Sequence, residues 1–334
     1  MADLRAGLLG AGMMGRNHAR VLRSLPGVQL VAVADEAGDP HGVAGDLLIR
    51  GGVDDLIEVG VDYVVVAAPT IVHTEVGLKL AAAGVHALIE KPLAADTAGA
   101  EALVDAFAAA GLIGAVGHIE RYNPALQQAR ARIEAGDLGD IYQVVTRRQG
   151  PFPGRIADVG VVKDLATHDI DLTAWVTQRE FERVSANVGH RSGRQHEDLV
   201  SVSGLLSGGI VTSHLVNWLS PFKERVTVIT GERGSFVADT LTADLTFHAN
   251  AVVNEDGSRN QMWDSLAVFR GVAEGDVTRY AFSKAEPLRT EHENFRDAVL
   301  GESADIVTMA QGLKVVRVAE AIIESARTGE VVEL

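Results

Sequence analysis

The first 118 residues alternate between short continuous apolar runs and longer segments rich in alanine and leucine. A short apolar run bounded by turn residues is typical of a strand buried on both faces. The longer segments have helical character and end at Pro26-Gly27 or at a glycine. This alternation predicts a parallel sheet with helices on both faces. The expected strands are residues 6–10, 29–35, 63–69, 86–92 and 112–118.

After Asn123 the pattern changes to a helical stretch, a strand and then a long region rich in β-branched residues with apolar and polar positions alternating. Such a region predicts an antiparallel meander with one face packed and the other wet or at an interface. The chain ends in two helical segments, and an apolar stripe on the last predicts packing against the core. We therefore expect a nucleotide-type α/β domain over residues 1–120 and an α/β domain with a large, mostly antiparallel open sheet over residues 121–334. The stripe consists of Leu313, Val316, Ala319, Ile322 and Ile323, and this helix can pack back on the first domain.

Composition narrows the possible partners. The chain has 334 residues and a net charge of −15, which argues against nucleic acid or an anionic membrane as the main partner. It contains no cysteine, which excludes disulfides, thiolate catalysis and cysteine-ligated zinc. No apolar run approaches the roughly 20 residues that span a bilayer, and the N-terminus lacks the basic start of a signal peptide. We expect a soluble, cytoplasmic protein.

The clearest motif follows the first predicted strand. Gly10, Gly12 and Gly15 form a Gly-x-Gly-x-x-Gly pattern between that strand and a helix. In a dinucleotide-binding turn the first glycine permits the tight turn, the second lets a pyrophosphate approach, and the third allows helix and strand to pack closely. The pyrophosphate would lie at the helix N-terminus, where free N–H groups favour anions. Met13 and Met14, within the same turn, are included among the expected cofactor-binding residues.

The residue at the end of the second strand bears on the cofactor. Asp35 follows Gly15 by twenty residues, where this fingerprint places an acid that binds the adenosine ribose. A carboxylate would repel the 2′-phosphate of NADP, and the next residues, 36–40, contain no Arg or Lys to bind it. The sequence therefore predicts a Rossmann domain that binds NAD.

Two other charged stretches carry candidate chemistry. Glu90-Lys91-Pro92 ends the fourth strand, at the sheet edge where open α/β sheets bind ligands. Farther on, Asp164, His168 and Asp171 would share one face of a helix. On the residues alone, that face could be a metal site, an acid/base site or a solvated helix surface. A lysine available as electrophile, with no cysteine for a zinc-dehydrogenase ligand set, argues against a catalytic metal.

Taken together, the segments "GAGMMGRNHARVL", "AAPTIVHTEV", "EKPLA", "GHIERYNPA", "DLATHDID" and "EHENFRDAV" resemble the Gfo/Idh/MocA oxidoreductases in content and order. The resemblance covers about residues 5–330. It implies a Rossmann domain followed by an α/β domain whose open sheet forms homodimers or homotetramers. It also implies that the family's loop beside the cofactor is formed here by Pro69, Thr70 and His73.

The resemblance also implies the roles of the charged residues. Lys91, preceded by Glu90, contacts the cofactor and the substrate and assists proton transfer. His168 becomes the general acid/base for a substrate hydroxyl, and Asp164 binds a neighbouring hydroxyl. A histidine suits this role because its pKa lies near the working pH. The acids that follow, Asp169 and Asp171, are expected to orient the histidine or to cap and solvate the helix.

Within the family, residues 117–124 and 150–171 look most like the subgroup that oxidises C3 of UDP-N-acetylglucosamine. Inositol or a free sugar is the alternative substrate, and a non-catalytic NAD-binding regulator is the alternative class. One departure is a short, glycine-containing segment around residues 41–52, where the family usually has a helix. The residues expected to bind the sugar nucleotide are Arg121, Tyr122, Asn123 and Arg155, together with Asp164. For residues 121–123 the alternative is that they simply join the two domains.

Overall fold

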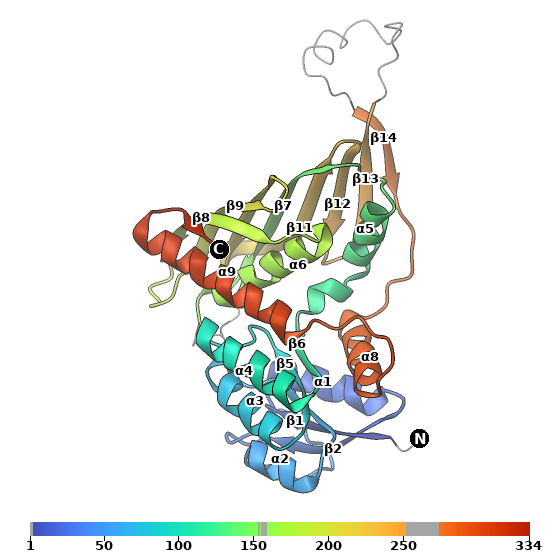
Figure 1. Cartoon of the computed structure of the whole chain (residues 1–334), viewed down its shortest axis with the longest axis vertical. Helices are drawn as coiled ribbons and strands as arrows, with labels where there is room; N and C mark the ends of the chain where they lie inside the picture. The colour runs from blue at the N-terminus through green and yellow to red at the C-terminus, as the bar shows by residue number, and fades with distance from the viewer. Residues whose placement is uncertain (1–2, 153, 155–158, 252–273) are drawn as a thin grey trace, which may run out of the picture.

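A computed structural model describes residues 3–152, 154, 159–251 and 274–334, which form two sheets with their covering helices (Figure 1). The first sheet is entirely parallel and has the strand order β3-β2-β1-β4-β5-β6. This is the order of a doubly wound dinucleotide-binding fold, as the alternating pattern predicted. Its strands are β1 (Leu4–Leu9), β2 (Val28–Ala34), β3 (Ile49–Arg50), β4 (Tyr63–Val66), β5 (His86–Glu90) and β6 (Gly114–Gly117).

Helices cover both faces of this sheet because its strands are apolar on both sides; all four residues of β4, for example, are buried. The departure noted around residues 41–52 is seen in the structure: where the family usually has a helix, this segment is irregular and contains the two-residue strand β3. Its glycines at 42 and 45 have φ of +64° and +61°, which a helix does not allow. The helical elements are α1 (Met13–Ser24), α2 (Val53–Val59), η1 (Thr70–Val72), α3 (His73–Ala82) and α4 (Thr97–Ala110).

The second sheet has nine strands and is mostly antiparallel, which confirms the expected open sheet. Its exception is β10, which pairs in parallel with β7. At its two edges the sheet is completed by β14 and by the short β15. The strands are β7 (Ile141–Pro151), β8 (Phe181–Gly189), β9 (Leu199–Leu206), β10 (Ile210–Asn217), β11 (Leu219–Gly231), β12 (Gly234–Asp239), β13 (Asp244–Asn250), β14 (Glu274–Arg279) and β15 (Val332–Glu333).

Helices α5, α6 and α9 pack on one face of the second sheet and enclose its core (Figure 1). Between β7 and α6 the chain forms η3, a five-residue π-helical turn. Helix α8 returns instead to the first domain, where Phe295 stacks edge-to-face on Tyr63 of β4. The helical elements are η2 (Ile119–Tyr122), α5 (Pro124–Glu134), η3 (Val162–Ala166), α6 (Thr167–Thr177), α8 (Pro287–Val299) and α9 (Met309–Thr328).

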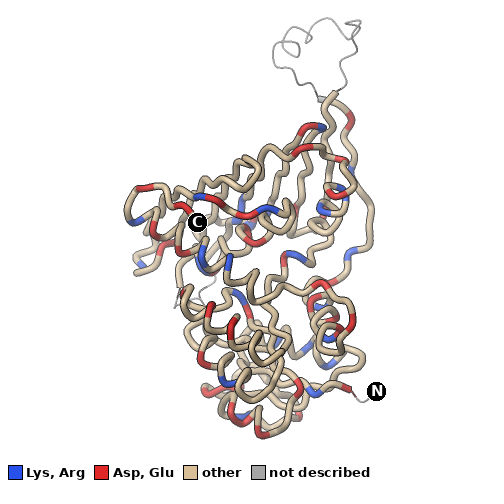
Figure 2. Tube along the Cα trace, viewed as in Figure 1, with Lys and Arg blue, Asp and Glu red and all other residues tan. Residues whose placement is uncertain are grey.

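The last long helix, α9, joins the two domains. It packs against α4 and β6 of the first domain and against α6 and β8 of the second. The predicted stripe holds: Leu313, Val316, Ala319 and Ile322 are buried and Ile323 is partly buried. None of the helices among the described residues is both long and apolar enough to cross a bilayer. Acidic side chains are frequent around α2, at the tip of the first domain (Figure 2).

Candidate active site in the cleft between the sheets

The turn from β1 into α1 brings backbone to the surface of a large pocket. Gly10 has φ of +104°, and a Cβ there would lie 2.4 Å from the carbonyl oxygen of Ala67. A Cβ on Gly15 would lie 1.9 Å from the carbonyl oxygen of Gly10, so helix and turn touch through backbone alone. At Gly12 a Cβ would meet nothing within 4 Å, which leaves open space before the α1 N-terminus. Each glycine thus has the geometry that the fingerprint requires.

Asp35 lies just beyond β2, on the same side of the pocket. Its carboxylate accepts hydrogen bonds from the backbone N–H groups of Ala11 (2.7 Å) and Ala37 (2.9 Å). These two bonds fix the carboxylate beside the glycine turn. Two further acids, Glu36 and Asp54, line the same pocket.

The pocket has a volume of about 850 Å³ and is lined by both domains. This size is within the range of cofactor and substrate sites. Both methionines of the glycine turn, the loop after β4 and the end of β5 contribute to its wall. Of the expected cofactor-binding residues, the structure places Gly10, Gly12, Met13, Met14, Asp35, Pro69, Thr70, Glu90 and Lys91 in this lining.

Lys91 connects the two domains inside this pocket. Its ammonium lies 3.0 Å from the Asp164 carboxylate and also donates to the Asp164 carbonyl oxygen, at 2.6 Å. Both side chains are largely buried, with 13% and 8% of their surface exposed. The π-helical turn η3 places Asp164 so that its carboxylate and its carbonyl both face Lys91. π-helical turns of this kind are often found at functional sites.

His168 lies in the first turn of α6 and lines the pocket beside this ion pair. Its Nδ1 is buried and accepts or donates no hydrogen bond among the described residues. Burial, reinforced by the nearby positive charges of Lys91 and Arg148, holds the pKa of His168 well below its usual value. The imidazole is therefore neutral near pH 7 and able to accept a proton.

The acids after His168 do not orient it or solvate the helix, so that expectation is wrong. Asp169 and Asp171 are each only 1% exposed. Asp169 accepts from Arg148 Nε (3.0 Å), and burial raises its pKa to about 6 despite that partner. Asp171 forms a two-pronged pair with Arg121, with Nη2 to Oδ1 at 2.6 Å and Nε to Oδ2 at 2.9 Å. Both acids are internal because each has its own arginine.

Comparison with known proteins agrees with this geometry. Residues 4–118 match the model of the oxidoreductase family with an NAD-binding Rossmann fold, and residues 126–237 match the GFO/IDH/MocA C-terminal domain. The chain belongs to the Gfo/Idh/MocA family of oxidoreductases. Its first domain is the family's NAD-binding Rossmann domain, and the open turn at Gly12 with the fixed Asp35 carboxylate fits that cofactor.

Individual relatives of this Gfo/Idh/MocA protein differ in substrate. UDP-N-acetylglucosamine 3-dehydrogenase of Acidithiobacillus ferrooxidans is 36% identical over 64% of this chain and 66% of its own length. The scyllo-inositol 2-dehydrogenase of Bacillus subtilis is 32% identical over 55% of this chain and 57% of its own length. The matched segments thus span less than two thirds of these relatives. The solved structure of the Acidithiobacillus enzyme GnnA superimposes with a TM-score of 0.80 at 26% identity, over 97% of this chain and 98% of that one.

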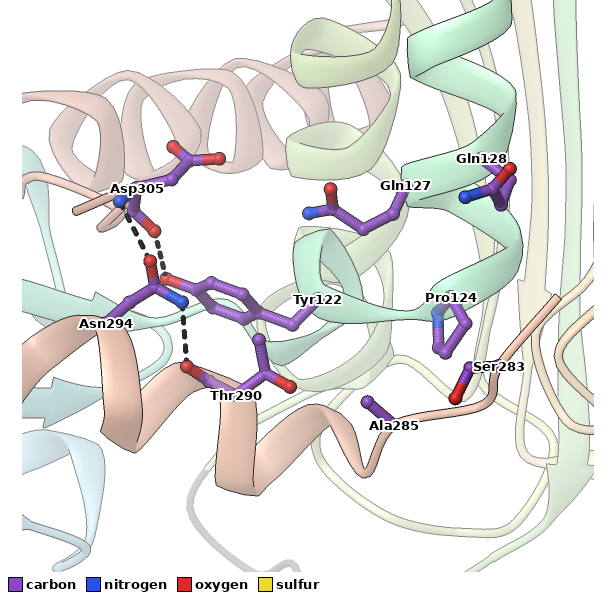
Figure 3. A pocket seen from close by; sticks show the side chains of 9 residues that line it. All are labelled: Tyr122, Pro124, Gln127, Gln128, Ser283, Ala285, Thr290, Asn294 and Asp305. Atoms are coloured by element: carbon purple, nitrogen blue, oxygen red, sulfur yellow. Dashed lines mark hydrogen bonds between the residues drawn. The ribbon is translucent and has the colours of Figure 1, made fainter. Parts of the chain in front are cut away.

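Three of the residues expected to bind a sugar nucleotide form hydrogen bonds within this Gfo/Idh/MocA protein instead. Arg121 is paired with Asp171, as described above. The Tyr122 hydroxyl donates to the Asp305 carbonyl oxygen at 2.9 Å, in a separate small hollow (Figure 3). Asn123 caps α5 and donates to the Thr240 carbonyl oxygen at 3.0 Å. The structure gives these side chains structural contacts outside the main pocket; Arg155 lies outside the described residues.

His73 lies behind the pocket rather than in its lining, contrary to its expected contact with the cofactor. It is buried, with Nδ1 at 2.9 Å from the Pro92 carbonyl oxygen and Nε2 at 3.0 Å from that of Ala68. A neutral imidazole donates to one of these oxygens. The ring therefore braces the loop after β4 against the chain after Lys91.

Glu90 is braced from behind in a similar way. Its Oε1 lies 3.0 Å from His18 Nε2, and its Oε2 accepts from the Lys91 backbone N–H at 3.1 Å. His18 Nδ1 in turn lies 2.9 Å from His292 Nε2 on α8. This chain of contacts runs from the pocket through α1 to the C-terminal part of the protein.

The acids around His168 do not face one common point. Asp171 points to Arg121 and Asp164 to Lys91, so the three residues considered as a metal site, Asp164, His168 and Asp171, do not converge. Over the described ranges, no group of three His, Asp or Glu side chains is arranged to hold a metal ion.

Sequence reasoning missed Glu120, Arg148 and Arg225, which surround the acidic side of α6. Glu120 accepts from Arg148 Nη1 at 2.8 Å and lies 3.6 Å from Arg225 Nη1. Glu120 and Arg225 also line the pocket. No motif marks these residues. Arg148 and Arg225 could have been noticed because the alternation of their strands places them on the buried face, where charged residues are unusual.

The Arg121–Asp171 pair predicts a stability effect. Asp171→Asn removes the charge but keeps the shape, and it leaves a buried guanidinium unpaired. Breaking a buried pair in this way costs about 3–5 kcal/mol of unfolding free energy. We expect a large decrease of the urea midpoint, measured by circular dichroism.

The matched control is Glu324→Gln, which breaks an exposed ion pair with Arg327 on α9. It should leave the urea midpoint unchanged, because exposed pairs contribute little. Equal midpoints for wild type and Asp171→Asn would show that Arg121 does not depend on Asp171.

Proposed function

We propose that this protein is an NAD-dependent dehydrogenase that oxidises a ring hydroxyl of a sugar or sugar nucleotide, with C3 of a UDP-sugar such as UDP-N-acetylglucosamine as the first candidate. The observation that carries the proposal is the Lys91–Asp164 pair, which lies in one pocket with His168 and the dinucleotide turn. A regulator that only bound NAD would need the turn but none of these three residues. Their convergence favours an enzyme.

The chemistry follows from the state of each group. Oxidising a secondary alcohol removes the hydroxyl proton while a hydride leaves the same carbon; NAD, when bound, supplies the hydride acceptor. Neutral His168 takes up the proton. The Lys91 ammonium stabilises the negative charge that develops on the oxygen. Asp164 holds this ammonium in place and offers a second oxygen to a neighbouring hydroxyl.

The relatives support a sugar or cyclic polyol as substrate but divide over which one. One is named for UDP-N-acetylglucosamine and another for scyllo-inositol. We place the UDP-sugar first, because of the higher identity and the match of GnnA over 98% of its chain. Incubation with NAD and a panel of UDP-sugars, free sugars and inositols, followed by NADH absorbance and product analysis, decides between them. A response to free sugars or inositols without one to UDP-sugars would exclude the first candidate.

Replacing the proton-handling groups should separate binding from turnover. In Lys91→Met and His168→Ala we expect kcat to decrease by at least about 100-fold, the usual contribution of such groups. NAD should still bind, because the glycine turn and Asp35 are intact. NADH formation measures the first effect and calorimetric titration with NAD the second. Lys314→Met, at an exposed pair on α9, is the control; full turnover in both site variants would refute these roles.

The pH profile should show the lowered pKa of His168. A proton acceptor must be neutral, so kcat/KM for oxidation is lost as the pH falls through this pKa. Because burial and the charges of Lys91 and Arg148 hold the pKa well below 6.5, kcat/KM should stay level as the pH falls to 6.5 and decrease only in more acidic solution. Initial rates across this range test it. An acid limb centred at or above pH 6.5 would contradict the assignment.

We also propose that the open sheet forms a homo-oligomer. Along β10 the residues alternate between buried and exposed, and the exposed ones include Val211 (44%) and Leu215 (38%). Apolar side chains on an uncovered sheet face are typical of an interface.

A charge on this face should weaken the association. We expect the wild type to elute as a dimer or tetramer in size-exclusion chromatography with light scattering, and Leu215→Glu to shift to smaller species. Leu241→Glu, at a residue in the turn after β12 that is at least as exposed as Leu215, is the control. A monomeric wild type would refute the proposal.

A further inference from the structure

Two arginines face each other in the second sheet. Arg225 of β11 and Arg148 of β7 are direct partners in the antiparallel register. Like charges directly opposite in such a pair are unfavourable. Arg148 is compensated by two carboxylates, Glu120 at 2.8 Å and Asp169 at 3.0 Å.

The positive charge of Arg225 is balanced by fewer nearby carboxylates than that of Arg148. Its Nη1 lies 3.6 Å from Glu120, beyond hydrogen-bonding distance, and that oxygen already accepts from Arg148. Within the described ranges, no protein group accepts a hydrogen bond from its guanidinium. Burial and the charge of Arg148 lower the pKa of Arg225. The side chain is 35% exposed, and it lines the pocket. It thus presents unused donors and a positive charge to whatever enters.

The location of Arg225 indicates which part of a ligand it meets. It reaches the pocket from the second domain, as do Asp164 and His168, and its charge acts on both. The dinucleotide turn and Asp35 belong to the first domain. Arg225 therefore lies on the side where the reacting hydroxyl is handled.

Resting on the proposed dehydrogenase function, we propose that Arg225 binds an anionic group carried by the sugar ring itself, so that the substrate is an acidic sugar. Among UDP-sugars this favours an acidic one over UDP-N-acetylglucosamine itself. A guanidinium matches a carboxylate or a phosphate with two parallel hydrogen bonds. A neutral hydroxyl could be bound by a neutral side chain without opposing Arg148. A feature that violates local pairing rules is expected where function requires it. A ring carboxylate and a sugar phosphate share this chemistry.

Binding of matched acidic and neutral ligands tests the proposal without requiring turnover. Calorimetry in the presence of NAD compares glucuronate with glucose, UDP-glucuronate with UDP-glucose, and glucose 6-phosphate with glucose. We expect the wild type to bind an acidic ligand more tightly than its neutral counterpart. In Arg225→Gln the acidic ligand should bind roughly 10- to 100-fold more weakly, with the neutral one unchanged. Arg225→Lys should retain part of the preference, and a preference confined to glucose 6-phosphate would identify phosphate as the group.

Two controls are a measurement of the stability of Arg225→Gln and a substitution of an arginine far from the pocket. Arg225→Gln relieves the opposition to Arg148, so its thermal unfolding temperature should equal or exceed that of the wild type. Arg317→Gln, which breaks an exposed ion pair with Glu101, should leave the affinity for both the acidic and the neutral ligand unchanged. The proposal is overturned by a wild type that binds no acid more tightly than its neutral counterpart, by equal losses for both, or by a loss confined to NAD. Turnover of a neutral UDP-sugar by a protein without acid preference would overturn this proposal while leaving the dehydrogenase function standing.

Discussion

The site depends on the need to pair the buried acids of one short segment. Asp164, Asp169 and Asp171 are each less than 10% exposed, and a buried carboxylate without a partner is very costly. Each takes its cation from a different element: Lys91 from the end of β5, Arg148 from β7 and Arg121 from η2. Satisfying the three acids therefore fixes η3 and α6 against the first sheet and the second at once. The cleft between the domains is the space that this pairing leaves.

The same pairing explains why His168 remains free to react. Because Asp169 and Asp171 are paired with arginines, the charges that act on His168 are those of Lys91, Arg148 and Arg225. These positive charges, together with burial, lower the pKa of His168 and keep it neutral. The π-helical turn adds to this arrangement, because it directs the backbone carbonyl oxygen of Asp164 and one oxygen of its carboxylate toward Lys91. The acid, the lysine and the histidine thus keep separate roles although they share one pocket.

The sequence predicted what depends on local pattern. The glycine turn, Asp35, Lys91 and the strand–helix alternation each carry a periodicity or a spacing that follows from backbone geometry, and the structure agrees. It did not predict the partners of the charged residues: Arg121 and Asp171 are 50 residues apart, and Arg148 and Asp169 are 21 apart. Which arginine meets which acid depends on how the helices pack on the second sheet. The sequence therefore predicts that Arg121 binds the substrate, whereas in the folded protein its guanidinium is paired with Asp171.

The positive surroundings of His168 also link binding to catalysis. Lys91, Arg148 and Arg225 all lower the pKa of His168, which keeps the base neutral but also makes it a weaker proton acceptor. An anion bound at Arg225 would offset part of this field and raise the histidine's pKa toward the working pH. General-base catalysis is most efficient when those two values are close. The base would then be strengthened only when the acidic ligand is bound, so that the arginine opposed to Arg148 would serve recognition and proton transfer together.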